Sequence, residues 1–281
     1  MSRFRGGLAL ARHSWSTLRA HRSLAAFPVL GGLMALVIVA PPALAAAYLV
    51  DRGDTVPGVL LGALAIYLVS FVAAFVGVGL AAAADAALRG QPASLGQGLR
   101  VARSRLRAIS GWALITALLS IVLRALESRS ELAAIAAALI GGAWSVISLL
   151  DIPAIAIEDL GPVEAMKRSA HIFKEHWRGQ VTGMAVIGGA VFLLVMLPAI
   201  GLVVAGVLIL SDSGSAGIGG GAVLLALGAV LFAGGAVLSN ALRQIFAVAL
   251  YRFVTTGEAV GGFDAAQLEN AVRVKGRPAV A

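Results

Sequence analysis

An uncharged stretch of 24 residues, "FPVLGGLMALVIVAPPALAAAYLV" at 27–50, follows a basic leader that contains Arg12, Arg19 and Arg22. As a helix it would be about 36 Å long, enough to cross the hydrocarbon core of a bilayer. It could be a secretory signal, a buried core helix or the first of several membrane spans. Residues 43–45 (Ala-Leu-Ala) resemble a small-x-small cleavage site. The long basic leader and the apolar stretches that follow favour an uncleaved first span.

The composition excludes an ordinary soluble fold. Hydrophobic residues make up 59% of the 281 residues and charged residues only 13%, against about 25% charged in a typical soluble domain. Such a chain has too little polar surface to face water, so we expect a bilayer to surround it. The chain has no cysteine, which rules out disulfides and thiolate chemistry. Abundant Ala, Gly, Val, Leu and Arg with little Lys indicate GC-rich codons and hence a bacterium.

Six segments meet the requirement of about 20 largely apolar residues for a transmembrane helix. The third carries Arg124 near its end, and a long basic side chain there can extend to the headgroups. We therefore predict an all-α transmembrane bundle of six spans, at roughly 27–50, 59–84, 109–126, 132–157, 181–210 and 217–248.

The basic residues predict the orientation of these spans. All but three of the 22 Lys and Arg residues lie in the N-terminal segment, in 85–108, in 158–180 or in the C-terminal segment from Arg243; the exceptions are Arg52, Arg124 and Arg129. Loops rich in Lys and Arg stay in the cytoplasm. Both termini are therefore expected to be cytoplasmic, in a bacterial plasma membrane. Topology and anionic headgroups explain the net charge of +8 without nucleic acid, for which no binding module is visible.

The first three of these basic segments also show the pattern of an amphipathic helix. Apolar residues recur at steps of three and four in all three: Phe4, Leu8, Ala11, Trp15 and Leu18; Leu95, Leu99, Ala102, Leu106 and Ile109; Val163, Met166, Ala170, Phe173 and Trp177. Such helices lie in the headgroup layer. The expected contacts with anionic lipid headgroups are Arg12, Arg19, Arg100, Arg103, Arg107, Lys167, Lys174 and Arg178.

Each amphipathic segment precedes two predicted spans, which suggests a threefold repeat. The units would be about 1–88, 89–157 and 158–254, and "SWSTLRAHR" (14–22) aligns with "SAHIFKEHW" (169–177). Independent origin of three basic amphipathic loops is the alternative. We predict one transmembrane domain over 1–255 and a polar cytoplasmic tail over 256–281.

Two motifs carry a resemblance to a known family: "SWSTLRAHRSLAAFPVLGGL" (14–33) and "DIPAIAIEDLGPVEAMKRSAHIFKEHW" (151–177). With them the chain resembles, over roughly 10–255, an uncharacterised family of bacterial six-span membrane proteins. It is more distantly similar to the membrane domain of some glycerophosphodiester phosphodiesterases. The resemblance implies a fold and a topology but no reaction, because the catalytic barrel of those enzymes is absent.

Four polar residues near the cytoplasmic ends of spans two, four and six are candidates for a functional site: Asp85, Asp151, Asn240 and Arg243. They could form one cluster in which Arg243 balances the two carboxylates and which opens to the cytoplasm for a substrate or proton. The alternative is structural: Asp85 pairs with Arg89 one helical turn later, and Asp151 lies at the interface.

Glycines and a proline within the last two spans predict their packing. Gly221, Gly228 and Gly235 recur every seven residues in span six, so one helix face would permit close helix approach or contact with another subunit. Pro198 is expected to kink the middle of span five.

We find no enzyme signature, so the sequence predicts no catalytic residue, no metal site and no cofactor. His171 and Glu175 stand four apart, but no second metal-ligand cluster accompanies them. The main hypothesis is therefore a non-enzymatic membrane protein that organises lipids or partner proteins. The alternative is a transporter or lipid-handling permease. Anionic lipids are the expected partners, while a protein partner or a second copy stays open.

Overall fold

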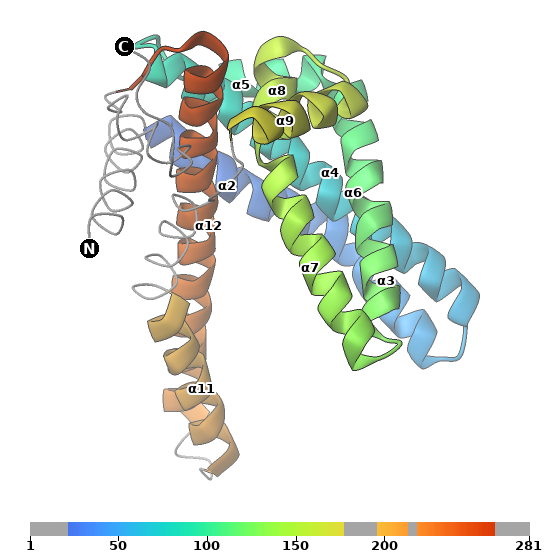
Figure 1. The fold of residues 1–281 in the computed structure, drawn as a ribbon. Coiled ribbons are helices and arrows are strands. Elements are labelled where there is room, and N and C mark those ends of the chain that lie inside the picture. The colour runs from blue at the N-terminus through green and yellow to red at the C-terminus, as the bar shows by residue number, and fades with distance from the viewer. Residues whose placement is uncertain (1–21, 177–195, 213–217, 262–281) are drawn as a thin grey trace.

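The computed structural model describes residues 22–176, 196–212 and 218–261, and these residues are helical with short connections, without a β-strand (Figure 1). The long helices pack side by side, and shorter ones gather at one end of the bundle. In chain order the elements are α2 (Arg22–Met34), η1 (Ala35–Val39), α3 (Ala40–Asp51), α4 (Thr55–Leu88), α5 (Leu95–Ser104), α6 (Leu106–Glu127), α7 (Glu131–Ile147), η2 (Ser148–Leu150), α8 (Asp151–Glu158), α9 (Pro162–His176), α11 (Leu197–Asp212) and α12 (Ile218–Thr256).

Four helical segments in the described part of the chain are long and apolar enough to cross a membrane: Ser23–Asp51, Thr55–Leu88, Leu106–Glu127 and Glu131–Glu158. They agree with the first four predicted spans to within four residues at every end. The fifth predicted span begins outside the described residues, and α11 covers its second half as a shorter apolar helix. The sixth falls within α12, which continues to Thr256. Four of the six predicted spans are therefore confirmed as membrane-length apolar helices, and the other two stay a prediction.

Two of these segments are interrupted, and prolines account for the positions. The five-residue π-helix η1 lies immediately before Pro41 and Pro42, which cannot donate the backbone hydrogen bonds that a continuous α-helix needs. The short 3-10 turn η2 precedes α8, where Pro153 occupies the first turn and its missing N–H costs little. Pro198 is the second residue of α11 and follows a π-helical residue at 196, while the preceding residues 177–195 lie outside the described part of the chain, so its predicted position in the middle of span five stays a prediction.

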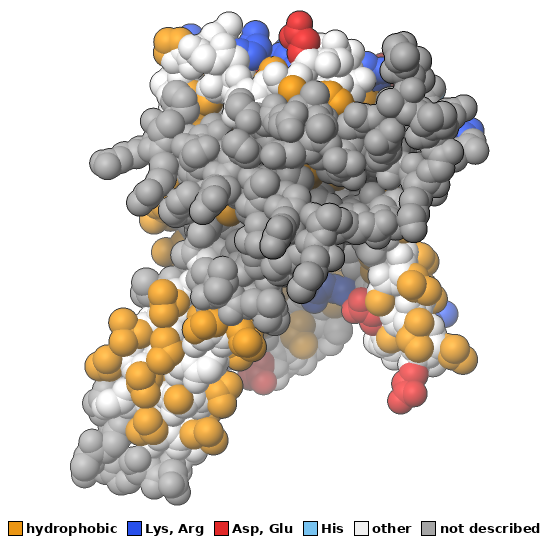
Figure 2. All heavy atoms as spheres, turned by 60° about the vertical axis from the view of Figure 1, so that its left-hand side comes forward, with side chains coloured by type: hydrophobic (Ala, Val, Ile, Leu, Met, Phe, Trp, Pro, Cys, Tyr) orange, Lys and Arg blue, Asp and Glu red, His pale blue; other side chains and the backbone are white. Residues whose placement is uncertain are grey.

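Large hydrophobic side chains are exposed along the long helices. In the most apolar 18-residue window of each of the four segments, less than a third of the residues are buried inside the protein. The α11–α12 hairpin, at the lower left of Figure 2, is covered with hydrophobic side chains. Soluble proteins rarely expose apolar patches of this extent. Together with their length, these faces indicate contact with lipid chains, as expected of an integral membrane protein.

The core lies at the end of the bundle where the short helices gather. The second half of α4 is buried there by α2, α5, α8 and α12. Glycines allow α4 and α5 to touch: a Cβ on Gly98 would overlap the carbonyl oxygen of Gly79, and the ring of Phe27 packs against both residues. This close approach holds the short helix α5 against the end of span two.

The starts of α5 and α9 agree with the sequence. The Ser94 hydroxyl caps α5 by accepting the Gln97 N–H at 3.2 Å. Helix α9 begins at Pro162, a residue type that fits a first turn, and the Gly161 N–H donates to the Glu164 carboxylate at 3.0 Å. These caps fix the two helices across the ends of the spans, where Figure 1 shows α9 lying over the bundle.

The buried face of α9 differs from its predicted apolar stripe. Val163 and Ala170 of the stripe are exposed, while Ala165, Ser169 and Ile172 are buried. Ser169 faces a buried carboxylate, described below. In the stripe over 95–109, Ala102 and Ile109 are buried.

The glycine face of α12 packs within the chain. A Cβ on Gly221 would come 3.0 Å from the Gly206 carbonyl oxygen of α11, and one on Gly228 would come 2.9 Å from the backbone nitrogen of Val203. Intrachain helix packing therefore accounts for these two glycines. The threefold repeat is not confirmed by this arrangement, and the first predicted amphipathic helix lies outside the described residues.

Candidate functional site at the basic end of the bundle

The end of the bundle formed by α5, α8 and α9 carries the predicted headgroup contacts. Five of them lie on the exposed faces of α5, α9 and the start of α6: Arg100, Arg103, Arg107, Lys167 and Lys174. The other three, Arg12, Arg19 and Arg178, lie outside the described residues. The loops after α3 and α6, with the helix ends beside them, carry four acidic and three basic side chains: Asp51, Asp54, Glu127, Glu131, Arg52, Arg124 and Arg129. Positive charge is therefore concentrated at one end.

Asp85, near the end of α4, is held by two arginines. Its side chain is 7% exposed. The Arg252 guanidinium donates from Nε to Oδ1 at 2.6 Å and from Nη2 to Oδ2 at 2.9 Å. Arg89, one turn later on α4, adds an ion pair of 2.9 Å to Oδ2. The parallel two-bond geometry is the strongest form of an arginine–carboxylate pair. Asp85 thus fastens α4 to the C-terminal part of α12.

This arrangement corrects the predicted polar cluster. Arg243 and Asn240 are exposed on α12, and within the described residues no ion pair or hydrogen bond joins them to either buried aspartate. Helix α12 continues past the predicted end of span six, so Arg252 is the arginine that lies level with Asp85. The predicted pairing of Asp85 with Arg89 is confirmed. An arginine isolated in the apolar run "FAVALYRFV" was the signal that could have identified Arg252.

Asp151 is fully buried where span four is interrupted. Its Oδ2 accepts the indole N–H of Trp112 on α6 at 3.1 Å, and the Ser169 hydroxyl of α9 also contacts the carboxylate. Its Oδ1 has no hydrogen-bond partner in the described structure. Asp151 therefore joins α6, α8 and α9 at one point and keeps one carboxylate oxygen unused. Trp112 was missed by our sequence reading, although a buried indole N–H usually needs an acceptor.

A third polar group joins α8, α9 and α12. Arg168 of α9 donates to the Glu158 carboxylate at 3.3 Å, and the buried ring of Tyr251 brings its hydroxyl beside them. Arg252, the partner of Asp85, follows Tyr251 directly. Adjacent residues of α12 thus contact both α4 and the α8–α9 pair.

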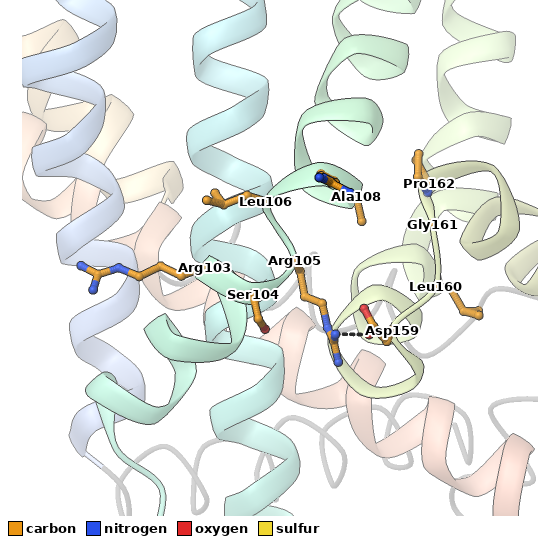
Figure 3. Close-up of a pocket in the computed structure, with 10 residues that line it drawn as sticks. Arg103, Ser104, Arg105, Leu106, Ala108, Asp159, Leu160, Gly161 and Pro162 are labelled. Atoms are coloured by element: carbon orange, nitrogen blue, oxygen red, sulfur yellow. Dashed lines mark ion pairs between the residues drawn. The ribbon is translucent and has the colours of Figure 1, made fainter.

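A pocket of about 580 Å³ opens between the α5–α6 junction and the loop from α8 to α9 (Figure 3). Arg105, between α5 and α6, reaches across to form an ion pair with Asp159, whereas Arg103 extends away from it. Asp159 has φ +58°, a left-handed conformation that turns the loop there. The pocket lining is Arg103, Ser104, Arg105, Leu106, Arg107, Ala108, Asp159, Leu160, Gly161 and Pro162.

These groups suit the binding of an anion better than acid–base chemistry. The three arginines of the pocket outnumber its one carboxylate, and arginine is a strong ligand for phosphate and carboxylate groups. Within the described residues there is no group of three His, Cys, Asp or Glu side chains that could hold a metal ion.

Comparison with known proteins identifies the family but no relative of known function. The profile of a family of unknown function, DUF6159, matches residues 58–262, so the chain belongs to this family. The match contains the motif at 151–177 and leaves out the one at 14–33. No curated protein and no solved structure matches the chain. The likeness to the membrane domain of glycerophosphodiester phosphodiesterases stays a prediction.

Proposed function

We propose that this member of the DUF6159 family is a non-enzymatic, multi-pass protein of the bacterial plasma membrane that gathers anionic lipids at its cytoplasmic face. The observation that carries the proposal is the concentration of exposed Lys and Arg on α5, α9 and the start of α6, at the ends of apolar membrane-length helices. Each basic residue near an anionic surface contributes about 1 kcal/mol of attraction. Five such residues on one rigid surface are enough to enrich anionic lipid around the protein.

The buried Asp85 supports this proposal over a polar transport path. Asp85 is neutralised by two arginines, and one of them belongs to a different helix. Such a carboxylate fastens helices together and has little capacity left for a substrate. The exposed basic surface, by contrast, has side chains that face outward without a large acidic counterpart.

The test measures lipid composition around the protein. Native nanodiscs are cut from the membrane with a polymer, and the phosphatidylglycerol fraction around the purified protein is compared with that of the bulk membrane. A variant with five substitutions, called the fivefold variant, replaces the exposed basic residues of this surface by glutamine: Arg100, Arg103, Arg107, Lys167 and Lys174. We expect enrichment in the parent and a return to the bulk fraction in this variant.

A matched control removes charge from the opposite end. The double variant Arg52→Gln and Arg129→Gln changes two exposed arginines in the loops after α3 and α6, and it should keep the enrichment of the parent. Equal enrichment in the parent and the fivefold variant would refute the proposal.

A transporter or lipid-handling permease is the second candidate, and one observation favours it. Asp151 is fully buried at the interruption of span four, and its Oδ1 lacks a partner in the described structure. Buried ionisable groups within membrane segments often mark ion or proton paths. If the protein carries protons, pyranine-loaded proteoliposomes with an imposed potential should acidify faster than empty vesicles, and Asp151→Asn should abolish the difference. Asp54→Asn, at an exposed site, is the control.

A further inference from the structure

We infer that the pocket between the α5–α6 junction and the α8–α9 loop binds a phosphate group, held by Arg105 and Arg107. This phosphate site rests on the proposed function, because it assigns to one pocket the anion binding that we propose for the basic surface as a whole. The pocket has about 580 Å³, within the range of small-molecule sites.

The charges in this pocket favour an oxyanion. Arg103, Arg105 and Arg107 line it, and Asp159 is its one acidic residue. Arg103 and Arg107 are exposed, so they can move toward a ligand. Two positive charges therefore remain after Asp159 is counted, which is enough to balance a phosphate monoester, with about two negative charges, or a diester, with one.

Arg105 has hydrogen-bonding capacity that Asp159 does not use. One terminal nitrogen pairs with Asp159, while Nε is buried and has no partner within the described residues. A buried N–H without an acceptor is costly. A guanidinium binds an oxyanion best through two parallel N–H groups. Phosphate would replace Asp159 as the partner of Arg105 and accept from Nε as well.

Two backbone positions of the loop offer no donor to an anion. The Gly161 N–H already donates to Glu164, and Pro162 has no N–H to offer. Arginine side chains are the charged donors of the pocket, so changing them should weaken its binding of an anion.

The position of the pocket suits the phosphate of a lipid. Leu106 and Ala108 are among the first residues of α6, an apolar helix of membrane length, and both line the pocket. A phosphate bound there would lie at the headgroup level with apolar surface directly below it. A free phosphate ester has the same chemistry, so the experiment includes both sources.

The experiment compares single-charge variants of the full chain. Inorganic phosphate is titrated calorimetrically into the protein in a neutral detergent, and dioleoyl phosphatidylglycerol binding is followed by native mass spectrometry. Arg107→Gln should weaken binding about tenfold, as loss of a charge-assisted contact implies. Arg100→Gln removes an equal charge from α5 outside the pocket, and it should change binding by less than twofold.

Asp159→Asn gives the opposite prediction. It removes the carboxylate that competes for Arg105, and asparagine tolerates the left-handed backbone at this position. Binding should become about two- to fivefold tighter, the range that loss of a partly exposed ion pair implies. Thermal unfolding of each variant in the same detergent shows that it remains folded.

The outcomes separate the pocket from the surface as a whole. Equal weakening of phosphate binding by Arg107→Gln and Arg100→Gln, or no tightening of binding by Asp159→Asn, would overturn the proposed phosphate site. Either result would leave the proposed lipid enrichment intact. Absence of saturable binding of both probes would overturn it as well. Binding of the lipid without binding of inorganic phosphate identifies a lipid headgroup as the ligand. Binding of inorganic phosphate identifies the phosphate group itself as the part that is recognised.

Discussion

Substitution of Asp85 by asparagine gives the sharpest test of the described packing. Asparagine keeps the shape of the side chain but removes its charge, so Arg252 loses two short hydrogen bonds to a carboxylate and Arg89 loses an ion pair. Removing one partner of a fully buried pair costs about 3–5 kcal/mol. The Arg252 and Arg89 side chains keep 21% and 41% exposure, so water can partly replace the carboxylate. We therefore expect a loss of about 2–3 kcal/mol.

Thermal unfolding of the purified protein in detergent, followed by tryptophan fluorescence, measures this loss. At about 2 °C per kcal/mol for a chain of this size, the midpoint should fall by about 4–6 °C. Asp54→Asn is the matched control, because Asp54 is exposed before α4 and caps no backbone N–H with its side chain. An equal midpoint for Asp85→Asn and Asp54→Asn would refute the structural role of the pair.

A double-mutant cycle shows whether the two residues act on each other. Arg252→Gln alone should cost about as much as Asp85→Asn, and the double variant should cost less than the sum by about 1–3 kcal/mol, since each single change already breaks the contact. Additive losses would mean that the residues act separately.

The remaining predictions concern helix packing and topology. Gly98→Ala places a methyl group against the Gly79 carbonyl oxygen and should destabilise the protein by about 1–3 kcal/mol, whereas Gly96→Ala on the same helix meets nothing within 4 Å and should be neutral or stabilising; equal thermal midpoints would contradict this packing. Because the chain has no cysteine, Ser104→Cys, at the end of α5 just before α6, and Ser128→Cys, just after α6, can each be labelled selectively. In whole cells an impermeant maleimide should label the second and not the first, and identical labelling of both would exclude the predicted crossing.

The membrane-length helices could be predicted from the sequence because hydrophobicity and length suffice for them. Four segments agree closely with the structure. The arginine that pairs with Asp85 was harder to predict from the sequence than the helices were. Arg243 and Arg252 stand on the same helix, and only the extent of α12 decides which one reaches Asp85.

The buried face of α9 shows a second limit. Hydrophobic periodicity included Ala170 in the apolar stripe and left out Ser169, yet in the structure Ala170 is exposed and Ser169 is buried. A buried carboxylate at Asp151 needs donors, and this need outweighs the small hydrophobic gain from an alanine. Arg103 and Arg107 were identified as basic surface residues, but that they line one pocket with Asp159 depends on tertiary contacts between segments more than 50 residues apart.

The bond between Asp85 and Arg252 also has a consequence for biosynthesis, because 167 residues separate its partners. When span two leaves the ribosome, Arg89 is already part of the nascent chain but Arg252 is not. Asp85 therefore gains its second arginine partner only after almost the whole described chain has been translated and inserted. Premature termination before Arg252 would leave the second span with an incompletely neutralised carboxylate. Such a product should be a preferred substrate for membrane proteases that remove unassembled chains.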